Sequence, residues 1–149
     1  MVEGRTTYFL DSTTLIHAID QGSEYQRECL NIINMAAKGL ISAATSLETL
    51  EETLFILSRL VSQETAIRVI RDYLRIREIG KYEMSQSTLE HALEIMEITP
   101  LRRPKDAINV ATMMENGIAV IISEDEDYDK TDLVERVHPK DVRGSEAPR

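Results

Sequence analysis

The segment IAVIISEDEDYD, residues 118–129, carries the strongest fold signal in this chain. Its first five residues are apolar and follow a glycine, a pattern typical of a short strand buried on both faces of a sheet. Acidic residues come where the strand would end. A second segment has the same pattern, with the apolar residues of 6–10 followed by Asp11. Because ligands bind at the carboxyl ends of parallel strands, the two segments predict one shared acidic crevice.

Outward from this segment, strand-like and helix-like patterns alternate along the chain. Strands are expected at residues 6–10, 40–44, 78–82, 118–122 and 133–137, and helices at 15–19, 24–37, 47–61, 63–77, 88–98 and 105–115. Serines that could cap helices precede several of these segments (Ser23, Ser46, Ser62, and Ser85 or Ser87). The alternation predicts a three-layer α/β/α sandwich around a mainly parallel sheet of four to five strands.

The chain has 149 residues, a length that suits one domain. Residues 143–149 are rich in Gly, Ser, Ala and Pro and are expected to form a loose tail. Cys29 is the sole cysteine, so an intrachain disulfide is excluded and a reducing compartment is favoured. The N-terminus lacks a signal-peptide pattern, and no stretch approaches the roughly 20 apolar residues of a membrane span. We therefore predict a cytoplasmic protein that does not associate with membranes.

The formal net charge of −9 restricts the possible partners. A polyanion such as RNA is repelled at long range, so a nucleic-acid substrate would require metal ions or a local basic patch. Taken alone, the charge is better explained by solubility.

Acidic residues in four segments are candidates for chemistry. Asp11, Asp125 and Asp127 follow strands, Asp106 begins a helix, and Glu52 lies opposite the apolar stripe of its helix. Each also has a simple structural role, as a helix cap, a turn residue, a partner of the helix dipole or a surface residue. Converging carboxylates would repel each other unless a hard cation such as Mg²⁺ or Mn²⁺ joined them. Phosphodiester hydrolysis is the natural reaction of such a site.

Four segments of the chain resemble PIN domains, and closely resemble the single-domain VapC-type toxin ribonucleases and their archaeal relatives. The segments are YFLDSTTLI (8–16), SAATSLETLEETLFIL (42–57), RRPKDAINVATMMENG (102–117) and IAVIISEDEDYDK (118–130). The resemblance implies a single PIN-like nuclease domain at residues 1–142. It also implies an endoribonuclease that uses Mg²⁺ or Mn²⁺, a homodimer, and, for a toxin, an antitoxin partner.

The resemblance also assigns residues to roles. It implies catalytic roles for four acids (Asp11, Glu52, Asp106 and Asp125) and metal ligation by another overlapping set (Asp11, Asp106, Asp125 and Asp127). In the helix segment the family acid falls at the last position of Thr49-Leu50-Glu51-Glu52, which favours Glu52, although Glu51 remains open.

Two positions depart from the family pattern. Thr13 stands where the family often has Asn, and it would have to support the acids together with Ser123. Tyr128 replaces the usual Phe, and we expect its ring to pack with the hydroxyl pointing outward. Neither change removes an acid.

Basic residues directly precede Asp106. Arg102, Arg103 and Lys105 are candidates to contact RNA phosphates, although a solvated loop would also explain them. The histidines are scattered, have no evident triad partner, and are expected to be structural (His17, His91 and His138).

Two alternatives to a nuclease have different requirements. A haloacid-dehalogenase-like phosphatase with Asp11 as nucleophile would need a second Asp two residues later, where this chain has Thr13. A non-cleaving PIN-like module that binds RNA or a protein partner within an assembly would need no intact acidic site.

Overall fold

The computed structural model describes residues 5–142, so the expected tail at 143–149 lies outside the described residues. The strands are β1 (Thr7–Leu10), β2 (Ser42–Ser46), β3 (Ile79–Tyr82), β4 (Val120–Ile122) and β5 (Glu135–Val137). They form one sheet in the order β3-β2-β1-β4-β5, and every neighbouring pair is parallel. The predicted parallel sheet is therefore confirmed.

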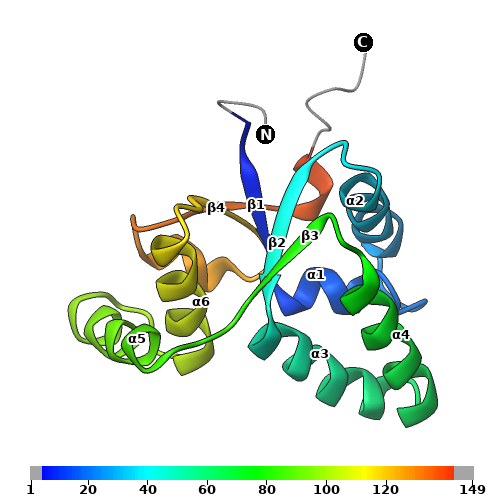
Figure 1. Cartoon of the computed structure of the whole chain (residues 1–149), viewed down its shortest axis with the longest axis horizontal. Coiled ribbons are helices and arrows are strands. Elements are labelled where there is room, and N and C mark those ends of the chain that lie inside the picture. The colour runs from blue at the N-terminus through cyan, green and yellow to red at the C-terminus, as the bar shows by residue number, and fades with distance from the viewer. Residues whose placement is uncertain (1–4, 143–149) are drawn as a thin grey trace.

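Helices cover both faces of this sheet (Figure 1). One face carries α1 (Ser12–His17), α2 (Gln26–Ala37), α3 (Leu47–Leu60) and α4 (Gln63–Arg75), and the other carries α5 (Gln86–Ile98) and α6 (Pro104–Glu115). Two short 3-10 helices complete the elements, η1 (Glu126–Lys130) and η2 (Pro139–Asp141). Serine side chains cap α3, α4 and α5 as the sequence predicted (Ser46, Ser62 and Ser85). The prediction for Ser23 was wrong, because the N-cap residue of α2 is Tyr25, whose side chain makes no capping hydrogen bond within residues 5–142.

The buried strand residues alternate between two hydrophobic cores. Phe9 and Ile121 pack with the α5–α6 layer, whereas the next residues, Leu10 and Ile122, pack with the α1–α4 layer. All four are fully buried. An unbroken apolar run is the expected sequence of a strand covered on both faces, so the packing confirms the three-layer sandwich.

The strand β2 begins at Ser42, two residues later than the predicted 40–44 segment. The reason lies in the end of α2, where Gly39 adopts a positive φ of 73°. There the Leu40 N–H donates to the Met35 carbonyl at 2.8 Å, which makes Leu40 part of the helix C-cap.

The strand β4 is shortened in the same way. Gly117 has a φ of 68°, and the Ile118 N–H donates to the Met113 carbonyl at 2.9 Å. Ile118 therefore closes α6, and the strand starts only at Val120. The predictions for 40–44 and 118–122 were wrong at their first residues for one shared physical reason.

The order of the strands determines where a site can form. The chain runs outward from β1 through β2 to β3, and then returns to place β4 on the other side of β1. The carboxyl ends of β1 and β4 thus meet where the direction of winding reverses, which is the usual ligand position in such sheets. Within residues 5–142, no helix is long and apolar enough to cross a membrane.

Candidate metal centre

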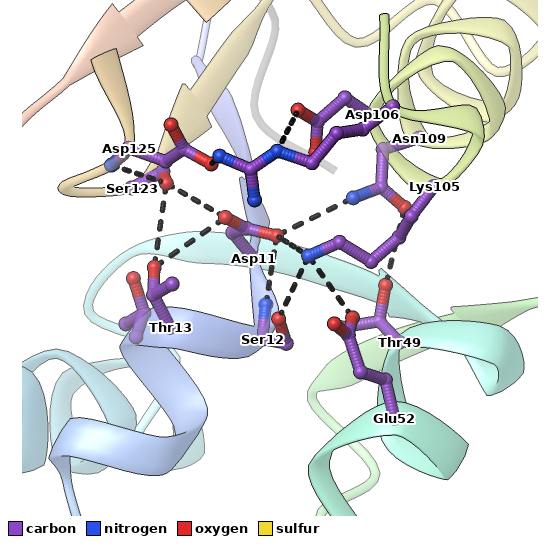
Figure 2. Close-up of polar contacts among 12 residues, drawn as sticks. Asp11, Ser12, Thr13, Thr49, Glu52, Lys105, Asp106, Asn109, Ser123 and Asp125 are labelled. Carbon is purple, nitrogen blue, oxygen red and sulfur yellow. Dashed lines mark hydrogen bonds and ion pairs between the residues drawn. The ribbon is translucent and has the colours of Figure 1, made fainter. Parts of the chain in front are cut away.

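Asp11 follows β1 and is fully buried at the centre of the acidic cluster (Figure 2). Its Oδ1 accepts a hydrogen bond from the Ser12 N–H at 2.9 Å, so it caps α1. Its Oδ2 accepts from the Ser123 hydroxyl at 2.7 Å, which ties β1 to the exit of β4. Burial raises the pKa of Asp11, against the opposing effect of the Lys105 ammonium and these hydrogen bonds. The cap and the site are therefore two functions of one residue.

Three further acids lie together at this edge of the sheet. Asp106, Asp125 and Asp127 offer ligand atoms that all lie within 4.8 Å of one another. We call them the acidic triad. Asp106 lies in the first turn of α6. Asp125 precedes η1, where its Oδ1 accepts from the Asp127 N–H at 2.9 Å.

Asp106 gives the clearest indication of what the triad can bind. It is 1% exposed, and neither of its carboxylate oxygens has a hydrogen-bond partner among the described residues. Desolvation is the main reason why its pKa is raised to about 6. A buried carboxylate without such partners is costly unless a cation compensates it. The oxygen-only donor set therefore fits a hard divalent cation such as Mg²⁺ or Mn²⁺.

The helix α3 brings Glu52 to the opposite side of the cluster. Glu52 Oε1 lies 3.0 Å from Lys105 Nζ, and the Glu52 side chain is 27% exposed. Glu51, the residue that the sequence left as an alternative, is exposed. The helical periodicity predicted a surface position for Glu52. Its side chain is instead half-buried and faces the other acids (Figure 2).

Two of the three basic residues expected to contact RNA, Arg103 and Lys105, form ion pairs with these acids. Arg103 Nη2 lies 2.8 Å from Asp127 Oδ2 and 3.2 Å from Asp125 Oδ2. Lys105 Nζ pairs with Glu52 and lies 3.9 Å from Asp11 Oδ1. Burial lowers the pKa of Lys105, but the nearby carboxylates raise it by more, so the pKa is raised. Arg102 is exposed, and its Nη1 lies 3.5 Å from the Thr99 carbonyl oxygen instead of against an acid.

The two residues expected to support the acids contact Asp11. Besides the Ser123 bond, the Thr13 hydroxyl lies 3.4 Å from Asp11 Oδ2. The Ser123 hydroxyl also accepts from the Asp125 N–H at 3.0 Å, which links Asp11 to the acidic triad.

The expected orientation of Tyr128 was wrong. Its side chain is fully buried, and its hydroxyl points inward, where it accepts from Asn109 Nδ2 at 2.9 Å and lies 3.4 Å from Asp11 Oδ1. The chain turns under the site in η1, which leaves the ring no path to solvent. Asn109 was missed in the sequence, although a polar residue one turn after Asp106 on an apolar helix is a usable signal. Thr49, whose hydroxyl donates to Asn109 Oδ1 at 3.3 Å, was missed as well.

His17 has partners that its sequence position did not reveal. Its Nδ1 lies 2.7 Å from the Ser23 hydroxyl, and its Nε2 pairs with the Glu124 carboxylate. Because Glu124 separates Ser123 from Asp125, this contact joins α1 to the segment that carries the site.

Comparisons with known proteins agree with this fold. A family model described as the PIN domain matches residues 8–134. VapC20 of Mycobacterium tuberculosis, described as a Sarcin-Ricin loop cleaving toxin, is 19% identical, with a TM-score of 0.69 over 82% of this chain and 92% of that one. A chain of VapBC2 of Rickettsia felis, solved bound to a DNA fragment from the promoter, is 13% identical. Its TM-score is 0.68, and the match covers 89% of this chain and 98% of that one.

DNA-bound VapBC of Salmonella typhimurium is 17% identical, with a TM-score of 0.66 over 90% of this chain and 98% of that one. At these identities the structural likeness establishes the fold. No curated protein matches the chain in sequence.

Proposed function

Because this chain belongs to the PIN domain family, and a solved structure of similar fold is described as a Sarcin-Ricin loop cleaving toxin, we propose that it is a metal-dependent endoribonuclease. It hydrolyses RNA phosphodiester bonds with Mg²⁺ or Mn²⁺. The observation that carries this proposal is the buried Asp106 carboxylate, which has no hydrogen-bond partner among residues 5–142 and lies beside Asp125 and Asp127. Such an arrangement is costly without a cation and favourable with one.

The acidic triad, with Asp11, would hold the cation. A bound cation supplies Lewis-acid stabilisation of the charge that develops on the phosphate. Asp11 is held by its donors, including Ser123, and would fix the position of the neighbouring groups.

Hydrolysis also requires proton transfers and charge stabilisation by the chain. Water adds to phosphorus in line as the bond to the 3′ oxygen breaks, so one proton must be removed from the water, and the leaving 3′ oxygen takes one proton from the solvent. Glu52 is the partly exposed carboxylate that would accept the proton from the water. Lys105, held between Glu52 and Asp11, would donate a hydrogen bond to a phosphate oxygen.

We also propose that residues 1–142 act as one nuclease domain, that the chain forms a homodimer, and that it is the toxin of a toxin–antitoxin pair. Solved neighbours described as VapBC and as a toxin–antitoxin complex from Klebsiella pneumoniae support an antitoxin partner. Apolar side chains on α5 are exposed and would suit a protein contact (Leu89, Leu93 and Ile98). Sedimentation velocity of the purified chain tests the homodimer, which a monomer at micromolar concentration would refute.

The nuclease proposal is tested by incubating the protein with single-stranded RNA and Mn²⁺. The test compares wild type with Asp11→Asn, Asp106→Asn and the exposed control Glu51→Gln. We expect both Asn variants to lose more activity than the roughly 10- to 100-fold typical of outer-shell changes at metal sites. Glu51→Gln should cleave like wild type. If wild type and both Asn variants behave alike, the chain is not a nuclease of this kind. RNA binding without cleavage would then favour the non-cleaving module.

A further inference from the structure

The guanidinium of Arg103 contacts the same carboxylates that would hold the cation. Its Nη2 lies 2.8 Å from Asp127 Oδ2 and 3.2 Å from Asp125 Oδ2, and its Nε lies 3.9 Å from Asp106 Oδ2. These three acids are the whole acidic triad. Arg103 is thus a cation tethered to the chain at the place where a divalent ion would bind.

The guanidinium and a divalent cation cannot use these oxygens together. A Mg²⁺ ion that joined Asp125 Oδ2 and Asp127 Oδ2 at its usual distance of about 2.0–2.1 Å would lie between these two oxygens, where Arg103 Nη2 now contacts both. The two cations would also repel each other at close range. Binding of the metal therefore requires that Arg103 move away.

Arg103 can withdraw its side chain from the acidic triad without a change in the backbone of α6. Its side chain is 56% exposed, whereas the side chains of Asp106 and Asp125 are 1% and 13% exposed. It precedes Pro104, the first residue of α6, and its backbone is extended, so its release would not disturb the helix. Lys105 differs, because its ammonium pairs with Glu52 outside the acidic triad and can stay in place when a cation binds.

We propose that Arg103 is a phosphate-binding residue whose availability is controlled by the metal. Without the divalent ion its guanidinium occupies the acidic triad, and with the ion it is displaced and binds a phosphate of the RNA beside the scissile bond. The inference rests on the proposed nuclease function and adds an order of binding, metal first and RNA second. Metal and RNA affinity are then coupled through one side chain, and the coupling is reciprocal.

The first test measures Mn²⁺ binding without any catalysis. Free Mn²⁺ is titrated by electron paramagnetic resonance against wild type, Arg103→Gln, Arg103→Lys and Arg102→Gln, and circular dichroism verifies that each variant is folded. The expected result is about three- to tenfold tighter Mn²⁺ binding by Arg103→Gln, the range that corresponds to removing two partly exposed ion pairs. Arg102→Gln removes an equal charge next to it and should change the affinity less than about twofold.

The second test measures the coupling with RNA. Fluorescence anisotropy follows a labelled single-stranded phosphorothioate RNA 12-mer, with and without saturating Mn²⁺, and a gel verifies that the RNA stays intact. Mn²⁺ should strengthen RNA binding by wild type, and Arg103→Gln should lose about three- to tenfold of that gain. Arg103→Lys should retain an intermediate gain, because an ammonium binds phosphate without the bidentate fork.

The outcomes separate this inference from the proposed function. If wild type binds Mn²⁺ and cleaves RNA, but Arg103→Gln matches Arg102→Gln in Mn²⁺ affinity and matches wild type in the gain in RNA affinity, the release of Arg103 is refuted and the nuclease proposal stands. If neither wild type nor Arg103→Gln binds Mn²⁺, both are refuted. Tighter Mn²⁺ binding with a smaller gain in RNA affinity supports the inference.

Discussion

Replacing Asp106 by Asn should stabilise the metal-free protein while it removes the metal response. Burial raises the pKa of Asp106 from its ordinary 3.8 to about 6. A pKa difference of one corresponds to about 1.4 kcal/mol, so the ionised carboxylate destabilises the folded state by about 3 kcal/mol at pH 7.5. Asn is neutral and of the same shape, but its buried amide also lacks partners. We therefore expect a gain of about 1–3 kcal/mol in the free energy of unfolding.

The gain should depend on pH with a definite sign. Because the folded pKa of Asp106 lies above the unfolded value, the unfolded chain releases its proton first as the pH rises from about 4 to about 6. The wild type loses stability over this interval, and the loss is complete above it. The difference between Asp106→Asn and wild type should therefore be about 2 kcal/mol smaller near pH 4.5 than at pH 7.5.

Urea denaturation with EDTA, followed by circular dichroism at both pH values, measures this difference. In thermal melts the same gain corresponds to a rise of roughly 2–10 °C for a chain of this size. Excess Mg²⁺ should stabilise wild type, by about 2.7 kcal/mol at 100 times its Kd, and should leave Asp106→Asn unchanged.

Asp127→Asn is the matched control within the same cluster. Hydrogen bonds from Lys130 and Arg103 lower the pKa of Asp127, so its ionised form favours the folded state and its replacement should not stabilise the protein. A metal-free Asp106→Asn variant that is less stable than wild type at pH 7.5, or whose difference from wild type does not change with pH, would refute the assignment of a buried charge that Lys105 and Arg103 only partly compensate.

Three smaller changes test the rest of the site. Tyr128→Phe removes the hydroxyl that lies against Asp11, and it should lower the free energy of unfolding by about 0.5–1.5 kcal/mol in urea titrations; an unchanged value would mean that this hydroxyl contributes nothing. Ser123→Ala removes a charged hydrogen bond to the same carboxylate and should cost about 1.5–3 kcal/mol in the same assay, more than Tyr128→Phe. Glu52→Gln should slow RNA cleavage by at least about 10²-fold while Glu51→Gln does not, and equal rates for the two would remove Glu52 from the proton transfer.

The fold could be predicted from short-range patterns because they agree with its long-range packing. The two central strands β1 and β4 have the apolar runs of strands covered on both faces. Serines that precede helical patterns marked three helix starts correctly. The predicted starts of two strands were wrong because apolar residues occur both in strands and at the C-terminal ends of helices. Leu40 and Ile118 look like strand residues but complete the helix ends at Gly39 and Gly117, and apolar residues are common at that position of the motif.

The candidate site could be predicted only as a set of acids, without their partners. The positions of Asp11 and Asp125 after buried strands, at adjacent places in the sheet, follow from topology alone. That Arg103 faces the acidic triad and that the Tyr128 hydroxyl turns inward depend on how α6 and η1 pack against the strand ends. Side-chain direction in irregular segments has no periodic signal, so such contacts become visible only in three dimensions.

The two buried acids of the site, Asp11 and Asp106, differ in the hydrogen bonds that compensate their burial. Asp11 has hydrogen-bond donors around both oxygens (the Ser12 N–H, Asn109 amide, Tyr128 hydroxyl, Ser123 hydroxyl and Thr13 hydroxyl). Asp106 has none among the described residues, and the nearest cationic group of Arg103 remains 3.9 Å away. Donors that are fixed by the fold hold the Asp11 carboxylate in one position beside the cation that it would help to bind. A carboxylate without such donors keeps its lone pairs available for a partner that arrives and leaves, and this division explains why the fold tolerates the unfavourable burial of Asp106.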